Sequence, residues 1–67
     1  MAKKRAPRTI RQIRARGLVP IRFRDDDGVY HGWIAKRGTR YLHLHLIARG
    51  RVRIPLADER YVTELAP

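Results

Sequence analysis

Three histidines are the side chains whose types and spacing could form a reactive site in this sequence. His43 and His45 are two residues apart in a segment that alternates leucine with polar residues, so both point to one face of a strand. His31 lies on the preceding segment and faces them if the two segments pair. Such a cluster could bind Zn²⁺ or Ni²⁺ or act in acid–base chemistry. Alternatively, the histidines are hydrogen-bond donors on a surface that they share with aromatic and arginine side chains. We favour the second role and expect no metal site.

Three successive carboxylates form the other cluster that could bind a cation. Asp25, Asp26 and Asp27 offer the oxygen ligands that Mg²⁺ prefers. They stand directly before Gly28, however, and Asp-Gly is a strong signal for a hairpin turn. Because no second acidic cluster lies nearby in the sequence, turn formation accounts for the aspartates.

Nucleophilic catalysis has little support in the composition. The sequence contains no cysteine and no serine, and its three threonines fall in a predicted helix cap, a turn and the terminal strand. We therefore expect neither an enzyme nor a cofactor. The absence of cysteine also excludes disulfide bonds and thiolate metal sites, and it fits the reducing conditions of the cytosol.

The net charge is the strongest functional signal. Sixteen lysines and arginines against six aspartates and glutamates give a formal charge of +10, and arginine outnumbers lysine thirteen to three. Residues 1–17 carry seven of these cations and no acid. The planar guanidinium group matches phosphate oxygens and stacks on bases. We therefore expect RNA or DNA as the partner.

The length of 67 residues allows one small domain, because so short a chain buries only about 60% of its unfolded surface. We expect a flexible basic arm at residues 1–8 and a single domain at residues 9–67. A signal peptide requires an apolar segment after its positively charged start, and none follows here. No run approaches the roughly 18 apolar residues of a membrane span. We therefore expect a soluble, cytoplasmic protein without a membrane partner.

A short basic helix is predicted at residues 9–16, at the start of the domain. Thr9 and Gln12 have the spacing of a capping box, and Ile10 and Ile13 share a helix face. A helix this short is not stable alone. It either docks through the two isoleucines onto the rest of the domain, or becomes ordered on a polyanion.

Alternating apolar and polar residues predict five short strands. They cover residues 18–24, 29–36, 41–48, 51–54 and 60–65, with a 3₁₀ turn at 55–59 before the last strand. In the first strand, Val19, Ile21 and Phe23 are expected to face the core. In the third strand, the core-facing residues are Leu42, Leu44 and Leu46.

Gly32 stands inside the second predicted strand, where glycine indicates a bend or a close approach of another backbone. Because a bend switches faces, the pattern leaves Trp33 unplaced. One interpretation exposes this side chain to stack on nucleic-acid bases. The other places it over the open end of a barrel as an apolar cap.

The order of these elements resembles the small SH3-like barrel, and the Sm-like barrels add an N-terminal helix to the same layout. The stretch from Thr9 to Leu46 resembles the helix and first motif of Sm- or Hfq-type proteins. It has a short basic helix, a Val-Pro pair before the first strand, Gly28 at the end of the first hairpin, and Gly32 two residues before Ile34. The resemblance implies a mainly β, five-stranded barrel that binds RNA and assembles into a homo-oligomeric ring through its edge strands. An SH3-like monomer would instead lay a strand face on DNA or RNA.

The sequence departs from the Sm pattern around that family's nucleotide pocket. Gly38 and His43 lie near the positions of the expected Asp and Asn. The Tyr-Lys-His segment of Hfq-type proteins is also missing, with residues 53–56 in its region. These differences affect the family's uridine pocket more than they affect the barrel.

The expected interface combines cations that bind phosphate with aromatic side chains that stack on bases. The cations are Lys3, Lys4, Arg5, Arg8, Arg11, Arg14 and Arg16 in the arm and helix, and Arg22, Arg24, Lys36, Arg37, Arg40, Arg51 and Arg53 in the strands and turns. The stacking candidates are Tyr41, His43, His45 and Trp33. We expect a nucleic-acid-binding protein, with RNA slightly favoured over DNA. The alternative is a protein-interaction module that docks on an acidic surface of a larger nucleic-acid-processing enzyme.

Overall fold

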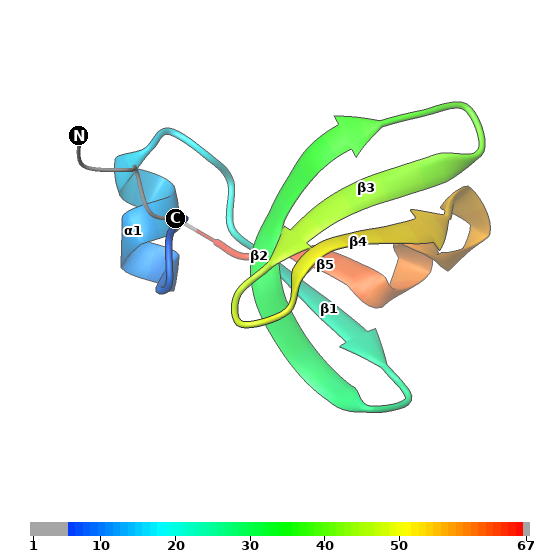
Figure 1. The fold of residues 1–67 in the computed structure, drawn as a ribbon, viewed down its shortest axis with the longest axis horizontal. Helices are drawn as coiled ribbons and strands as arrows, with labels where there is room; N and C mark the ends of the chain where they lie inside the picture. Colours follow the sequence, from blue (N-terminus) through cyan, green and yellow to red (C-terminus); the bar gives the residue numbers. More distant parts are fainter. Residues whose placement is uncertain (1–5, 67) are drawn as a thin grey trace.

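Five antiparallel strands form one sheet, in the order β4–β3–β2–β1–β5 (Figure 1). The structure is a computed structural model, and it describes residues 6–66. Its elements are α1 (Ile10–Ala15), β1 (Ile21–Asp25), β2 (Gly28–Arg37), β3 (Tyr41–Leu46), β4 (Gly50–Pro55), η1 (Leu56–Tyr61) and β5 (Val62–Glu64). The predicted mainly β class is confirmed, with a short helix first and a 3₁₀ helix before the last strand. β4 and β5 form opposite edges that no described pairing joins, so the sheet is open.

β2 curves between its two partner strands (Figure 1), and Gly32 is the residue of β2 that pairs with both of them. It pairs with Ile21 of β1 on one side and with Leu46 of β3 on the other. A Cβ atom at this position would lie 1.8 Å from the carbonyl oxygen of His45. The predicted close approach of another backbone is therefore confirmed, and it explains why the middle of a ten-residue strand carries no side chain.

The hydrophobic core collects the apolar positions of the alternating strands on one side of the sheet. Its buried members are Ile21, Phe23, Leu42, Leu44, Leu46 and Ile54. The alternation of β3 is followed without exception, because its three leucines are at most 1% exposed. Full burial of such a side chain contributes about 1.5–3 kcal/mol, so this core accounts for much of the folding free energy.

Helix α1 docks on the sheet through one fully buried residue, Ile13. Thr9 caps the helix, because its hydroxyl accepts a hydrogen bond from the Gln12 backbone N–H at 3.1 Å. The Gln12 side chain accepts from the backbone N–H of Arg8 at 2.6 Å, one residue before the position that a capping box would use. At the other end, the Arg14 guanidinium donates to the carbonyl of Ala66 and ties the helix to the end of the described chain.

The start of the first strand differs from the sequence prediction. Val19 is 53% exposed and Pro20 is buried, so the alternation begins only at Ile21. Proline has no N–H to donate to a ladder, and the strand therefore starts after it. The carbonyl of Pro20 still accepts from the Leu65 N–H at 2.9 Å, and this bond holds the last described residues beside β1.

Two further strand boundaries, the end of β3 and the start of β5, differ from those predicted from the sequence. Residues 47–49 form the turn between β3 and β4, where Ala48 has a positive φ of 68°, so β3 ends earlier than predicted. The 3₁₀ helix η1 extends to Tyr61 and shortens β5 to three residues.

Candidate nucleic-acid interface

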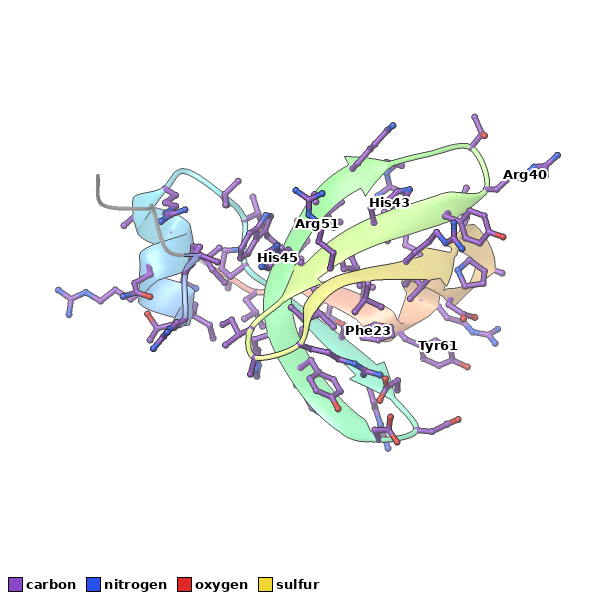
Figure 2. All side chains as sticks on the ribbon, viewed as in Figure 1. Phe23, Arg40, His43, His45, Arg51 and Tyr61 are labelled. Atoms are coloured by element: carbon purple, nitrogen blue, oxygen red, sulfur yellow. The ribbon has the colours of Figure 1, made fainter. Side chains whose placement is uncertain are left out.

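Polar side chains of three neighbouring strands share the side of the sheet opposite the core. The alternation of β3 that buries its leucines turns Tyr41, His43 and His45 the other way. We call this surface the outer face, and it consists of Trp33, Lys36, Tyr41, His43, His45, Arg51 and Arg53. Figure 2 shows His43, His45 and Arg51 along β3 and β4, apart from Phe23 in the core.

The register arranges the outer face in rows across the strands. Trp33, His45 and Arg51 are directly paired and form one row. Lys36, His43 and Arg53 form the next row. Seven of the predicted site residues are thus brought together, although they come from three separate parts of the sequence.

Trp33 and His45 are stacked, and this settles the orientation that the sequence left open. Their ring centroids are 4.3 Å apart and the ring planes differ by 7°. Both side chains are half-buried. The stack is a consequence of cross-strand pairing, because directly opposed residues bring their side chains into contact.

A β-bulge at Ala35 decides which cations reach the outer face. The register shifts between Ile34 and Lys36, so Lys36 pairs with His43 while Arg37 lies opposite Leu42. The side chain of Arg37 donates two hydrogen bonds to the carboxylate of Glu59 in η1, at 2.7 and 2.6 Å. These bonds raise the pKa of Arg37 and lower that of Glu59. Among the predicted cations of β2, therefore, only Lys36 joins the outer face.

Tyr41 extends the outer face toward the β2–β3 connection. It is 40% exposed, and the guanidinium carbon of Arg53 lies 4.5 Å from its ring centroid. A guanidinium over a tyrosine ring is a favourable cation–π contact that also holds the arginine in place. Arg40 lies at the tip of the same hairpin, separate from the two rows (Figure 2).

The outer face carries no acidic residue. The six aspartates and glutamates of the chain are Asp25, Asp26, Asp27, Asp58, Glu59 and Glu64, which lie at the end of β1, in the β1–β2 turn, in η1 and in β5. No ion pair of the described residues involves Lys36, Arg51 or Arg53. Their charge is therefore available to an external anion.

Arg22 and Arg24 face a different surface. They line an open hollow beside the β1–β2 turn, together with Arg60, Tyr61 and Thr63. The aspartates of the turn line the same hollow, so its charge is of mixed sign. Sequence reasoning missed Arg60 and Tyr61, because a strand was predicted where η1 continues.

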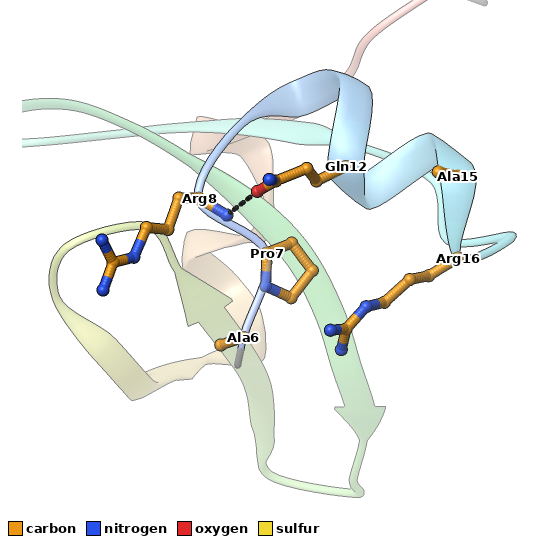
Figure 3. A pocket seen from close by; sticks show the side chains of 6 residues that line it. All are labelled: Ala6, Pro7, Arg8, Gln12, Ala15 and Arg16. Atoms are coloured by element: carbon orange, nitrogen blue, oxygen red, sulfur yellow. Dashed lines mark hydrogen bonds between the residues drawn. The ribbon is translucent and has the colours of Figure 1, made fainter. Parts of the chain in front are cut away.

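The cations around α1 form a third group. Arg8, Arg11, Arg14 and Arg16 are all exposed. Two of them, Arg8 and Arg16, border a hollow between the helix and the buried Pro7 (Figure 3). Lys3, Lys4 and Arg5 lie outside the described residues.

The aspartate cluster performs the turn role predicted for it. One oxygen of Asp25 accepts hydrogen bonds from the backbone N–H groups of Asp27 and Gly28, at 2.8 and 3.2 Å. Arg49, which the sequence analysis did not single out, donates to the other oxygen at 2.7 Å and lowers the pKa of Asp25. The same guanidinium lies 4.8 Å from the ring centroid of Tyr30.

Residues 6–66 contain no group of three or more histidine, aspartate or glutamate side chains placed to hold a metal ion. Within the same residues, no helix is long and apolar enough to cross a membrane. In comparisons with known proteins, no family model matches the chain, and no curated protein or solved structure matches it significantly.

Proposed function

We propose that this chain binds nucleic acid, with RNA slightly favoured over DNA, through the outer face and the basic N-terminal segment. One observation carries the proposal: the outer face joins a stacked Trp33–His45 pair to three cations and contains no carboxylate. Cations bind the phosphates, and aromatic rings offer surfaces on which bases stack. The proposal includes no catalytic step and no cofactor.

We infer further that the open sheet is a small barrel of the SH3-like or Sm-like type. The strand order, the helix before β1 and the 3₁₀ helix before β5 support this inference. The free edges of β4 and β5 are surfaces on which identical chains can pair into a homo-oligomer. Light scattering of the purified protein gives the oligomeric mass directly.

Binding to labelled oligonucleotides tests the proposed function. Fluorescence anisotropy with single-stranded RNA, single-stranded DNA and duplex DNA is measured at several salt concentrations. We expect affinity to fall steeply with salt, and the double variant R51Q/R53Q to reduce the log–log slope on single strands by about 1.4, for two lost phosphate contacts.

A matched control removes the same charge elsewhere. Arg37 is turned to the core side of the sheet and Arg60 lies over Tyr61, so R37Q/R60Q leaves the outer face intact. Equal losses in both double variants would contradict the outer face as the binding site. An affinity that does not respond to salt would contradict nucleic-acid binding through phosphates.

The second candidate function is docking on an acidic protein. The observation in its favour is the hollow of mixed charge beside β1, where Arg22, Arg24 and Arg60 lie with three aspartates and with the exposed side chains of Val29 and Tyr61. An affinity column from nuclease-treated lysate distinguishes the two functions. A protein partner that survives nuclease treatment, is lost in the R24E variant and is kept in the R53E variant would support this candidate.

A further inference from the structure

A hollow with a positive rim lies at the row of Lys36, His43 and Arg53, and Arg51 of the neighbouring row also lines it. Its other lining residues are Ala35, Leu44 and Val52. Lys36 approaches from β2 and the two arginines from β4, so the cations face the hollow from both sides of β3. A phosphate group is the anion that such a cluster of lysine and arginine recognises best.

The Trp33–His45 stack lies one row away from this hollow. Trp33 occupies the β2 side of the His45 ring, and Arg51 is the register partner of His45 on the β4 side. A base that lies against the β4 side of the His45 ring, next to Arg51, would continue the stack. Neighbouring rows on one strand face are about 7 Å apart, a separation that a base and the phosphate of its own nucleotide can span.

We propose that the outer face binds a single unpaired nucleotide, with the base stacked on His45 and the phosphate held by Lys36, Arg51 and Arg53. This inference rests on the proposed function and adds the class of nucleic acid. In a duplex, each base is covered by its neighbours on both faces, so the stack accepts only a base that has left the helix. The protein therefore selects single strands, loops or ends over uninterrupted duplex.

The test compares two oligonucleotides with the same number of phosphates. One is a single-stranded DNA eight-mer, and the other is the same chain with abasic sites at all positions. The full-length protein is titrated with each, and binding is followed both by anisotropy of a terminal label and by tryptophan fluorescence. Trp33 is the sole tryptophan of the chain, so the emission comes from one member of the stack.

We expect the normal eight-mer to bind at least about five-fold more tightly than its abasic counterpart, since each stacked base contributes about 1–3 kcal/mol. We also expect only the normal oligonucleotide to quench Trp33. A short duplex closed at both ends by non-nucleotide linkers has no unpaired base, and it should not quench Trp33.

A pair of histidine variants assigns the effect to the stack. His45→Ala removes the ring against which the base lies, and it should make the normal and abasic oligonucleotides bind equally. His31→Ala is the matched control, because His31 pairs with Arg22 of β1 and lies outside both rows. Circular dichroism checks that each variant is folded. If a variant does not fold, the comparison of the normal and abasic oligonucleotides on the unmodified protein still tests the proposal.

The outcomes separate the inference from the proposed function. If the normal and abasic chains bind the unmodified protein equally, or if saturation leaves Trp33 emission unchanged, the single-nucleotide site is wrong while nucleic-acid binding stands. If no oligonucleotide binds at low salt, both are wrong.

Discussion

At Gly32, the carbonyl of His45 on the neighbouring strand occupies the place where a side chain would begin. A Cβ atom there would lie 1.8 Å from that oxygen, and both atoms belong to the backbone of a paired sheet. The strands must therefore separate to admit even a methyl group. We expect Gly32→Ala to lower the free energy of unfolding by about 3 kcal/mol or more, measured by urea denaturation with Trp33 fluorescence as the probe.

Gly38→Ala is the matched control for this substitution. A Cβ at Gly38 would lie 3.1 Å from the Tyr41 carbonyl oxygen, a contact that a shift of a few tenths of an ångström relieves. We expect a cost below about 1 kcal/mol. Similar costs at both glycines would show that β2 and β3 do not approach each other as described.

The sequence predicted the side chains of β3 well and those at the end of β2 poorly, for a reason that lies in single residues. β3 alternates without interruption, so its faces follow from the period of two alone. In β2, the period continues through Gly32, because Tyr30, Gly32 and Ile34 all lie opposite core residues, and only the bulge at Ala35 breaks it. The position of Arg37 depends on this bulge, which local sequence does not mark. Trp33 lies where alternation with Ile34 places it, and the sequence left it open only because Gly32 suggested a change of face.

At the scale of elements, α1 depends on one buried side chain. Ile13 is fully buried while Ile10 is only half-buried, although both were predicted to dock. We expect Ile13→Ala to cost about 2–4 kcal/mol of unfolding free energy, and Ile10→Ala to cost clearly less. Chemical denaturation of the two variants provides the measurement. Equal costs would mean that the helix is not anchored as described.

Two ion pairs connect elements that are distant in sequence, and their pKa values give stability a pH dependence. Arg49 links the β3–β4 turn to Asp25, and Arg37 links β2 to Glu59. Each arginine lowers the pKa of its carboxylate partner in the folded state. The unfolded chain therefore binds protons more tightly, so the stabilisation is present above the unfolded pKa of about 4 and is lost as the pH falls through the lower folded values.

We expect Glu59→Gln to reduce the difference in melting temperature between neutral pH and about pH 2.5, because the variant has lost one of the two linked carboxylates. The effect is small, since both pairs face solvent. Asp26→Asn is the control, because Asp26 forms no ion pair among the described residues. A larger change in this control than in Glu59→Gln would contradict the assignment.

The sequence predicted the number, order and type of the elements, because each is marked by a local pattern. Turn residues separate the strands, and a capping threonine marks the helix. The ends of elements were less predictable, since they depend on contacts made across the fold. Pro20 is buried beside the last described residues, and η1 continues to Tyr61 where alternation had suggested a strand.

For the whole molecule, the distribution of charge matters more than its sum. The net charge is +10, yet the carboxylates gather in the β1–β2 turn, in η1 and in β5, away from the outer face. The sequence alone predicted a basic protein, and three of the predicted cations, Lys36, Arg51 and Arg53, lie together on the outer face. Of the remaining predicted cations, Arg37 binds Glu59 and Arg40 lies at the tip of the β2–β3 hairpin. The others are divided among the surface around α1, the hollow beside β1 and the residues before the described chain.

The contribution of the cations before the described residues to nucleic-acid affinity is tested by counting phosphate contacts. Lys3, Lys4 and Arg5 are three cations, and each contact with a single strand contributes about −0.7 to the log–log salt slope. If all three contact phosphates, the variant K3Q/K4Q/R5Q should show a slope that is shallower by about 2. Anisotropy with one single-stranded RNA over a range of salt concentrations measures both slopes.

The matched control exchanges the same positions without loss of charge. In K3R/K4R/R5K the slope should remain that of the unmodified protein, because counterion release depends on the number of phosphates neutralised and not on the shape of the cation. An unchanged slope in the glutamine variant would place the affinity in the outer face and around α1. A shift of equal size in the charge-preserving variant would instead show that these residues act by shape, through hydrogen-bond geometry that arginine and lysine do not share.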